Sequence, residues 1–165
     1  MHPKILATNI VLPPYTRSTE ESMPYVEAWL SQHPDERFRE KVRRLFKYAQ
    51  VDRRYSIMDI DEVFKETSFE EKNTFFSNAF IDLTHQALKG ALEKANLLPT
   101  DIDYIITVSC TGIMIPSIDA YLINLLKMRQ DIVRMPITEM GCAGGTSALI
   151  YAYNILKTNP GKKAA

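Results

Sequence analysis

The sequence predicts an α/β fold in which a mixed sheet is covered by helices. The apolar, β-branched run 104–109 has the composition of a strand buried on both faces. The extended apolar segment 132–137 is predicted to be the next strand, although Pro136 removes one ladder donor near its end. A helical pattern follows each of them, one starting at Pro116 and Ser117 and the other covering about 143–156. Strand and helix thus alternate through the second half of the chain, which is the order typical of α/β proteins.

One strand and two helices are predicted in the first 50 residues. The segment 4–12 has the composition of a strand, and the two prolines that follow it cannot continue a ladder. A short helical stretch covers 25–31, and a stronger helix covers 35–50, where apolar residues recur at three- and four-residue spacing. The next segment, 50–64, is predicted to be an irregular link.

The longest predicted helix runs from Ser68 to Asn96. Ser68 and Glu71 have the spacing of a capping box, and acidic residues are favourable in the first turn of a helix. Six apolar residues are expected to form one stripe along this helix: Phe76, Phe80, Leu83, Ala87, Ala91 and Ala95.

Length and composition fit a single domain covering residues 1–165. Hydrophobic residues make up 45% of the chain, which is enough for an ordinary core. The 20 basic and 20 acidic side chains cancel, so nucleic acid and membrane surfaces are not expected as partners. No apolar run approaches the ~20 residues of a spanning helix, and no signal-peptide pattern is present, so we expect a cytoplasmic protein.

The two cysteines, Cys110 and Cys142, are expected to be free thiols, because their spacing is not that of a redox or zinc motif. No metal site is predicted, since paired histidine ligands are missing as well. Cys142 follows Gly141 at the junction between the strand predicted over 132–137 and the helix after it.

That junction predicts a nucleophile. A thiol near a helix N-terminus is close to unpaired N–H groups that favour the thiolate, which can carry an acyl group. Gly144 and Gly145, next in the chain, allow backbone or substrate to approach closely. The alternative is that Cys142 is a small buried residue with a packing role.

A nucleophilic cysteine usually needs a histidine or a cationic neighbour, and the sequence offers no persuasive one. His2 is terminal, His33 lies in a His-Pro turn, and His85 lies on the long helix away from its apolar stripe. We expect His85 to be a polar helix residue without a catalytic part.

Eight basic side chains are concentrated between Arg37 and Arg54. Lys41 and Arg44 are three residues apart and share a helix face, with Arg37 one turn earlier. Such a face could hold the phosphates of a coenzyme, because arginine and lysine are the usual phosphate partners. The alternative is a solvated helix surface.

The segment from Ser109 to Pro116 follows the first buried strand and is predicted to be a loop that lines a pocket. Cys110 is a second candidate nucleophile there, but no glycine-rich helix start follows it. A role in lining the pocket or in packing is therefore the favoured interpretation of Cys110.

Three of these segments together resemble the N-terminal half of the type III polyketide synthases, the chalcone and stilbene synthase family. They are Gly-Cys-Ala-Gly-Gly-Thr at 141–146, the Cys-Thr-Gly loop ending in proline at 110–116, and Val-Asp-Arg-Arg-Tyr at 51–55. The resemblance extends over nearly the whole chain. It implies the N-terminal half of a thiolase-like fold, in which two similar halves form a dimer-forming unit of roughly twice this length.

The resemblance also implies roles for particular residues of this sequence. Cys142 matches the catalytic cysteine, which takes the starter acyl group from coenzyme A and holds the growing chain. Lys41 and Arg44 match coenzyme A contacts. Cys110 matches a position that lines the cavity, and Ile115 matches a residue that reaches across the dimer into the partner's cavity. A third family lysine that contacts coenzyme A falls at Tyr48, and Lys47 is the candidate substitute for it.

The activity that the resemblance implies is that of an acyltransferase. Such an enzyme condenses an acyl-CoA starter with malonyl-CoA by decarboxylative Claisen condensation on a cysteine thioester, in polyketide biosynthesis, as naringenin-chalcone synthase does. Coenzyme A thioesters are then substrates, no cofactor is expected, and the protein should act as a homodimer. The family's histidine and asparagine, which activate the cysteine and stabilise the negatively charged intermediates, lie in the second half. We therefore expect the present chain alone to be inactive.

Two other functions are compatible with the sequence. One is an initiating ketoacyl-ACP synthase of fatty-acid synthesis, which shares the fold and the Cys-His-Asn chemistry. The other is a non-catalytic half-thiolase domain that dimerises or binds acyl-CoA. The sequence ends just after a helix terminator at 159–161, where an α/β fold normally begins its next strand. This predicts a fragment of a longer protein, and the alternative is a short disordered tail on a complete small domain.

Overall fold

Two parallel strands form the centre of the second half of the chain in the computed structural model, which describes residues 2–165. β3 (Tyr104–Val108) pairs in parallel with β4 (Val133–Ile137). The connection between them contains α5 (Ile118–Leu125), because parallel strands need a crossover rather than a tight turn. The predicted strand–helix–strand order of this region is confirmed.

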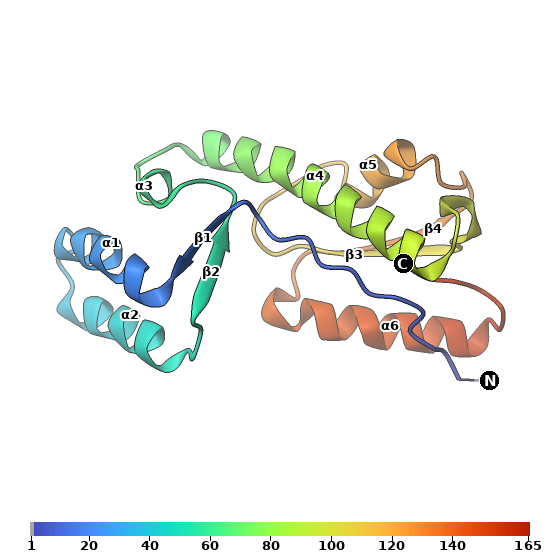
Figure 1. Ribbon diagram of the computed structural model, residues 1–165, viewed down its shortest axis with the longest axis horizontal. Helices are drawn as coiled ribbons and strands as arrows, with labels where there is room; N and C mark the ends of the chain where they lie inside the picture. Colours follow the sequence, from blue (N-terminus) through green and yellow to red (C-terminus); the bar gives the residue numbers. More distant parts are fainter. Residues whose placement is uncertain (1) are drawn as a thin grey trace. The chain divides into compact units, whose positions relative to one another are not determined.

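Helices cover both faces of this parallel pair (Figure 1). α4 (Phe69–Ala95) and α5 lie on one face, and α6 (Gly144–Thr158) lies on the other. The buried cluster lies on the face covered by α4 and α5, where it joins these helices to β3, and none of its members belongs to α6. Its members are Leu92, Ile102, Ile105, Ile118, Leu122, Ile123, Met128 and Ile132.

The chain divides into two compact units. The first consists of Met1–Val11 together with Glu70–Ala165 and contains the parallel pair, while the second consists of Leu12–Phe69. The first unit also includes two short 3₁₀ turns, η1 (Pro99–Asp101) and η2 (Gly141–Ala143).

The six residues of the apolar stripe predicted for α4 are all partly buried, but most of them do not reach the buried cluster. Leu92 is buried in the cluster, and Phe80, Ile81 and Leu88 pack against it, so only Phe80 belongs to the predicted stripe. The physical reason is that α4 has more than one packed side. The Ala87 carbonyl accepts a hydrogen bond from Asn9 of the N-terminal segment, and Phe76 stacks on Phe80.

The strand predicted over 4–12 is also wrong, because the segment is extended but pairs with no strand in the described part of the chain. Side-chain bonds hold it instead. Asn9 Nδ2 donates to the Ala87 carbonyl at 3.3 Å, and Lys94 Nζ donates to Asn9 Oδ1 at 2.6 Å. The side chain of Ile10 is 79% exposed, so this apolar segment is not packed as a strand of a buried sheet would be.

The last residues of the chain run alongside β3 on the edge opposite to β4. Ala164 forms a parallel bridge with Tyr104, and the Ala165 carbonyl accepts a hydrogen bond from Ile106 N at 2.8 Å. After the helix terminator, the chain therefore pairs with β3 in the manner of a strand at 164–165.

Asp103 ties this terminal segment to the rest of the unit. Its carboxylate accepts bonds from Lys162 Nζ at 2.8 Å, Lys163 N at 3.0 Å and Arg129 Nη1 at 2.9 Å. The Lys162 ammonium, the Lys163 N–H and the Arg129 guanidinium together lower the pKa of Asp103 from 3.8 to about 2.

The second unit pairs β1 (Tyr15–Ser18) in antiparallel fashion with β2 (Arg53–Ser56). Since β2 and the short helix α3 (Ile60–Val63) fall within 50–64, the prediction of an irregular link there is wrong. The sequence of β2 shows no apolar alternation, and its strand state depends on β1 as the partner.

Two longer helices complete this unit. α2 (Glu36–Tyr48) matches the predicted helix, and the Asp35 carboxylate caps its first N–H groups. α1 (Thr19–Ser31) starts six residues earlier than the predicted 25–31 stretch, because Ser18 and Glu21 form a capping box. No helix within residues 2–165 is long and apolar enough to cross a bilayer.

Candidate active site

Cys142 lies in the short connection between β4 and α6, as predicted. It is the middle residue of η2, two residues before Gly144, the first residue of α6, and its thiol is free and exposed. Gly141 has a φ of +51°, a backbone conformation that side chains rarely adopt, and this turn separates Cys142 from the strand. The alternative of a buried packing cysteine is therefore wrong.

Close packing fixes the start of α6 against the sheet. Gly144 is buried, and a Cβ atom added to it would lie 2.5 Å from Cγ1 of Val108, the last residue of β3. A β-branched side chain at the end of a strand has little freedom to move away. Gly145, by contrast, faces open space. The helix that follows Cys142 can approach β3 this closely only because residue 144 has no side chain.

Both cysteines emerge at the same edge of the parallel pair. Val108 and Ile137 are opposite each other at the strand ends, and Ser109 N donates to the Ile137 carbonyl at 3.0 Å. Cys110 follows Ser109 and Cys142 follows β4, and ligands of parallel sheets collect at this carboxyl edge. Cys110 is a free, exposed thiol, so packing does not account for it.

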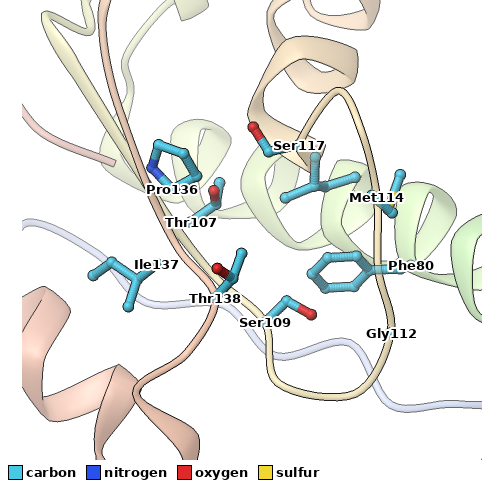
Figure 2. Close-up of a pocket in the computed structure, with 10 residues that line it drawn as sticks. Phe80, Thr107, Ser109, Gly112, Met114, Ser117, Pro136, Ile137 and Thr138 are labelled. Atoms are coloured by element: carbon cyan, nitrogen blue, oxygen red, sulfur yellow. The ribbon is translucent and has the colours of Figure 1, made fainter.

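A small cavity lies beside this edge, between the strand ends and the loop after β3 (Figure 2). Its volume of about 20 Å³ is that of one water-sized group, so it is too small for an acyl chain. Ser109 Oγ, among its lining atoms, is buried and has no hydrogen-bond partner within residues 2–165. Its lining residues, which do not include Cys110, are Phe80, Thr107, Ser109, Gly112, Met114, Ser117, Ile118, Pro136, Ile137 and Thr138.

Ile115 projects from the loop after β3 and is 93% exposed. The part of the loop just before it is anchored. Asn73 Nδ2 donates to the Ile113 carbonyl and Asn73 Oδ1 accepts from Ile113 N, both at 2.9 Å, and Met114 packs against the core. A large apolar side chain held outward by an anchored loop fits the predicted contact with a second protomer, which stays a prediction.

An ion pair between a buried carboxylate and a partly exposed arginine, which the sequence did not predict, holds the next helix to the sheet. Asp119 on α5 is fully buried, and its Oδ2 accepts from Arg134 Nε on β4, whose Nη2 also lies 3.3 Å from Ser117 Oγ. Asp119 Oδ1 has no partner in the described part of the chain. The signal in the sequence is a single acidic residue in an otherwise apolar helix.

His85 lies on α4, and the other two histidines are beside aromatic residues. His33 stacks on Phe38, and His2 Nδ1 lies 3.4 Å from the hydroxyl of Tyr153. Within residues 2–165, neither thiol is hydrogen-bonded to a histidine, and no group of three or more His, Cys, Asp and Glu residues could hold a metal ion. The described residues thus provide the exposed thiol and its helix terminus, without a bonded base.

The predicted basic face belongs to the second unit, where it lines a shallow hollow of about 460 Å³ on α2. Lys41 and Arg44 both line it, so the structure confirms that they share a face. Lys47 does not line the hollow, since its Nζ lies over the Tyr48 ring, 5.5 Å from the centroid. The lining residues are Arg37, Glu40, Lys41, Arg44, Leu45, Tyr48 and Ala49.

Comparison with known proteins gives one consistent result. Residues 4–164 match the model of the family described as "Chalcone and stilbene synthases, N-terminal domain". The 1,3,6,8-tetrahydroxynaphthalene synthase of Streptomyces coelicolor is 30% identical over 152 residues, which is 92% of this chain and 40% of that protein. The phloroglucinol synthase of Pseudomonas fluorescens is 28% identical over 141 residues, which is 86% of this chain and 40% of that protein.

The solved structures agree with the sequences. The crystal structure of the Streptomyces coelicolor A3(2) tetrahydroxynaphthalene synthase, a bacterial type III polyketide synthase, superposes with a TM-score of 0.83 at 30% identity. The match covers 96% of this chain and 46% of that one, so the present fold is that of the N-terminal half of a type III polyketide synthase. The chain spans less than half the length of these relatives. On its residues, its fold and the match over 4–164, this chain belongs to the chalcone and stilbene synthase family.

Proposed function

We propose that Cys142 accepts an acyl group from a coenzyme A thioester and holds it as a cysteine thioester. The observation that supports this proposal is a free, exposed thiol two residues before α6, at the carboxyl edge of the parallel strands. α6 begins two residues later, and unpaired N–H groups at a helix N-terminus favour both a thiolate and the oxyanion that forms when it attacks a carbonyl.

The proposed acyl transfer needs no cofactor, because the thiolate and the thioester supply every bond that forms or breaks. The Cys142 thiolate attacks the thioester carbonyl, the bond from that carbonyl to the coenzyme A sulfur breaks, and coenzyme A leaves as a thiolate that takes up a proton. Chain extension then uses malonyl-CoA. Loss of CO₂ from the malonyl group leaves an enolate, whose carbon attacks the Cys142 thioester and releases the thiolate of Cys142 again.

We propose that extension needs a longer protein than residues 1–165. The resemblance places the histidine and asparagine that assist decarboxylation in the C-terminal half of the family's fold. In support, neither thiol has a histidine bonded to it within residues 2–165. We therefore expect the 165-residue chain to form no polyketide, and we assign the whole of it to the N-terminal half of a condensing enzyme.

The product and the assembly are also proposals. The two relatives named above are synthases of phenolic compounds, and naringenin chalcone is a further product of this chemical class. We propose a cyclised polyketide as the product of the complete enzyme. The exposed Ile115 supports a homodimer, and the two free thiols support a reducing compartment such as the cytoplasm.

The test is the mass of the complete enzyme, the proposed longer protein that contains residues 1–165, after incubation with a panel of acyl-CoA thioesters. We expect an added acyl mass that hydroxylamine removes, that Cys142→Ala abolishes and that Cys110→Ala retains. Acylation that follows Cys110 instead would contradict the assignment. A chain that binds acyl-CoA without any acylation would favour the non-catalytic acyl-CoA-binding alternative, and acylation from acyl-ACP alone would favour the ketoacyl-ACP synthase.

A further inference from the structure

We propose that Asn73 is a positioning residue that holds the loop 110–115 on α4 and so determines how the acyl chain on Cys142 is extended and folded. This inference rests on the proposed acylation of Cys142. The two hydrogen bonds of the Asn73 side chain go to the backbone of the loop, so its role concerns the loop and the space beside it.

The side-chain amide of Asn73 pairs with both backbone groups of a single loop residue. Its Nδ2 donates to the Ile113 carbonyl and its Oδ1 accepts from Ile113 N, both at 2.9 Å. An amide suits this place because the peptide presents one acceptor and one donor side by side. Aspartate has the same shape, but it offers acceptors only and would turn a negative charge toward the Ile113 carbonyl.

Two aromatic rings further along α4 support the residue before Ile113. A Cβ atom added to Gly112 would lie 2.1 Å from Cδ1 of Phe76, and Phe76 stacks on Phe80 with ring centroids 5.0 Å apart. Asn73, Phe76 and Phe80 have the i, i+3 and i+7 spacing of one helix face. One face of α4 therefore holds two consecutive residues of the loop, by an amide pair and by contact with a ring.

The anchored part of the loop lies beside the segment that leads to Cys142. Gly112 and Met114 line the small cavity together with Thr138, the residue that follows β4 (Figure 2). Cys110 is exposed at the same carboxyl edge of the strands. An acyl chain held by Cys142 would therefore start near this loop, and the position of the loop would limit the space open to the chain.

Acylation and extension should depend on Asn73 to different degrees. The position of Cys142 is set by the turn at Gly141 and by the packing of Gly144 on Val108, and none of these residues belongs to the loop. Extension adds atoms that have to fit the space beside the loop. A loop that takes several positions would therefore admit products of several lengths and ring closures, while the first acylation would continue.

The experiment uses the complete enzyme that contains residues 1–165 and compares Asn73→Ala with Asn78→Ala. The first variant removes both bonds to Ile113, and the second makes the same change at an exposed position of the same helix. Three quantities are measured by mass spectrometry. They are the amide hydrogen exchange of the peptide that contains Ile113, the rate at which one acyl-CoA acylates Cys142, and the product mixture formed after malonyl-CoA is added.

A second pair of variants tests the ring contact in the same three measurements. Gly112→Ala places a methyl group against the Phe76 ring and should displace the loop. The double variant of Gly112→Ala with Phe76→Ala removes the ring atoms that the methyl group would meet, so it should lie closer to the wild type than Gly112→Ala alone.

We expect Asn73→Ala to speed hydrogen exchange at Ile113 about fivefold, which is the effect of losing one ordinary hydrogen bond. Products of other length or ring closure should increase relative to the main product by up to about the same factor, because the population of other loop positions rises by that factor. Acylation of Cys142 should stay within about twofold of the wild type. Asn78→Ala should match the wild type in all three measurements.

Three results would overturn the inference while leaving the proposed function in place. Exchange at Ile113 that is equally slow in Asn73→Ala and Asn78→Ala would show that the pair does not hold the loop. Faster exchange with an unchanged product mixture would show that the loop does not control extension. An equal loss of acylation and extension in Asn73→Ala would show a general effect on the fold. A wild-type enzyme without acylation of Cys142 would instead overturn the proposed function, and this role of Asn73 with it.

Discussion

The two units of the chain hold their candidate sites in opposite ways. In the first unit, Cys142 is positioned by a packed core and by a glycine that lies against Val108. In the second unit, α2 has no buried residue, and the buried side chains are confined to three positions of α1. Close packing therefore fixes the position of Cys142, whereas the site on α2 consists of exposed charged side chains. The stability and the ligand binding of the two units should respond differently to substitution, acid and salt.

Breaking one ion pair in each unit should give the largest difference in the free energy of unfolding between the two units. Arg134→Met leaves the Asp119 carboxylate fully buried without its cation, and we expect a loss of about 3 kcal/mol in the free energy of unfolding. Arg43→Met breaks the pair with Glu27, whose side chains are 44% and 41% exposed, and should cost less than about 1 kcal/mol. Urea unfolding of both variants measures the difference.

The double variant of Arg134→Met with Asp119→Asn separates charge burial from packing. It should recover part of the lost stability, since no unpaired charge is then buried. Equal losses from the Arg134 and Arg43 variants would show that the two units do not differ in this way.

The glycines that follow Cys142 should show the next largest effect. Gly144→Ala forces a methyl group against Val108 and should destabilise the chain by about 1–3 kcal/mol. Gly145→Ala places the same methyl group in open space within α6 and should be neutral or stabilising by up to about 1 kcal/mol. Thermal unfolding compares the two, and a Gly145 variant as unstable as the Gly144 variant would contradict the close packing of α6 on β3.

Acid should weaken the first unit through Asp103. Its pKa is lowered from 3.8 to about 2 in the folded chain, so its stabilising contribution is complete above the higher value and is lost as the pH falls toward the lower one. The stability difference between the wild type and Asp103→Asn should therefore shrink between these two pH values. Glu27 in the second unit, whose pKa Arg43 lowers, is exposed and should give a smaller change in Glu27→Gln. A difference for Asp103→Asn that does not depend on pH would contradict the ion-pair origin of its effect.

Salt should change the reactivity of the Cys142 thiol very little and should weaken the binding of coenzyme A to α2 clearly. Raising NaCl from about 0.05 M to about 0.5 M should weaken coenzyme A binding several-fold, because exposed charges are screened. The alkylation rate of Cys142 by neutral iodoacetamide should change by less than about twofold over the same range, since no ion pair positions the thiol. Salt-independent binding of coenzyme A would count against the role of the α2 cations.

The local sequence predicted those elements whose own pattern is strong. The apolar runs 104–109 and 132–137 became β3 and β4, and the helical spacing over 35–50 became α2. Elements that depend on a distant partner were not predictable in this way. The segment 4–12 has strand composition without a strand beside it, and β2 has the partner without the composition.

The candidate site shows the same division. The strand–turn–helix context of Cys142 is local, and the sequence predicted it correctly. The contact of Gly144 with Val108 and the pairing of Asp119 with Arg134 join positions far apart in the chain, and no local pattern encodes them. The exposure of Cys110 likewise follows from the path of the loop rather than from its composition.

Protection of the two thiols in one chain tests the central claim most directly. The complete enzyme that contains this chain is alkylated with iodoacetamide at neutral pH, with and without an acyl-CoA, and peptide mapping gives the rate at Cys110 and at Cys142. If Cys142 carries the acyl group, acyl-CoA should slow its alkylation, hydroxylamine should restore it, and Cys110 should keep its rate. Equal rates at both cysteines, with no protection of Cys142 by any acyl-CoA, would contradict its assignment as the acyl-carrying nucleophile.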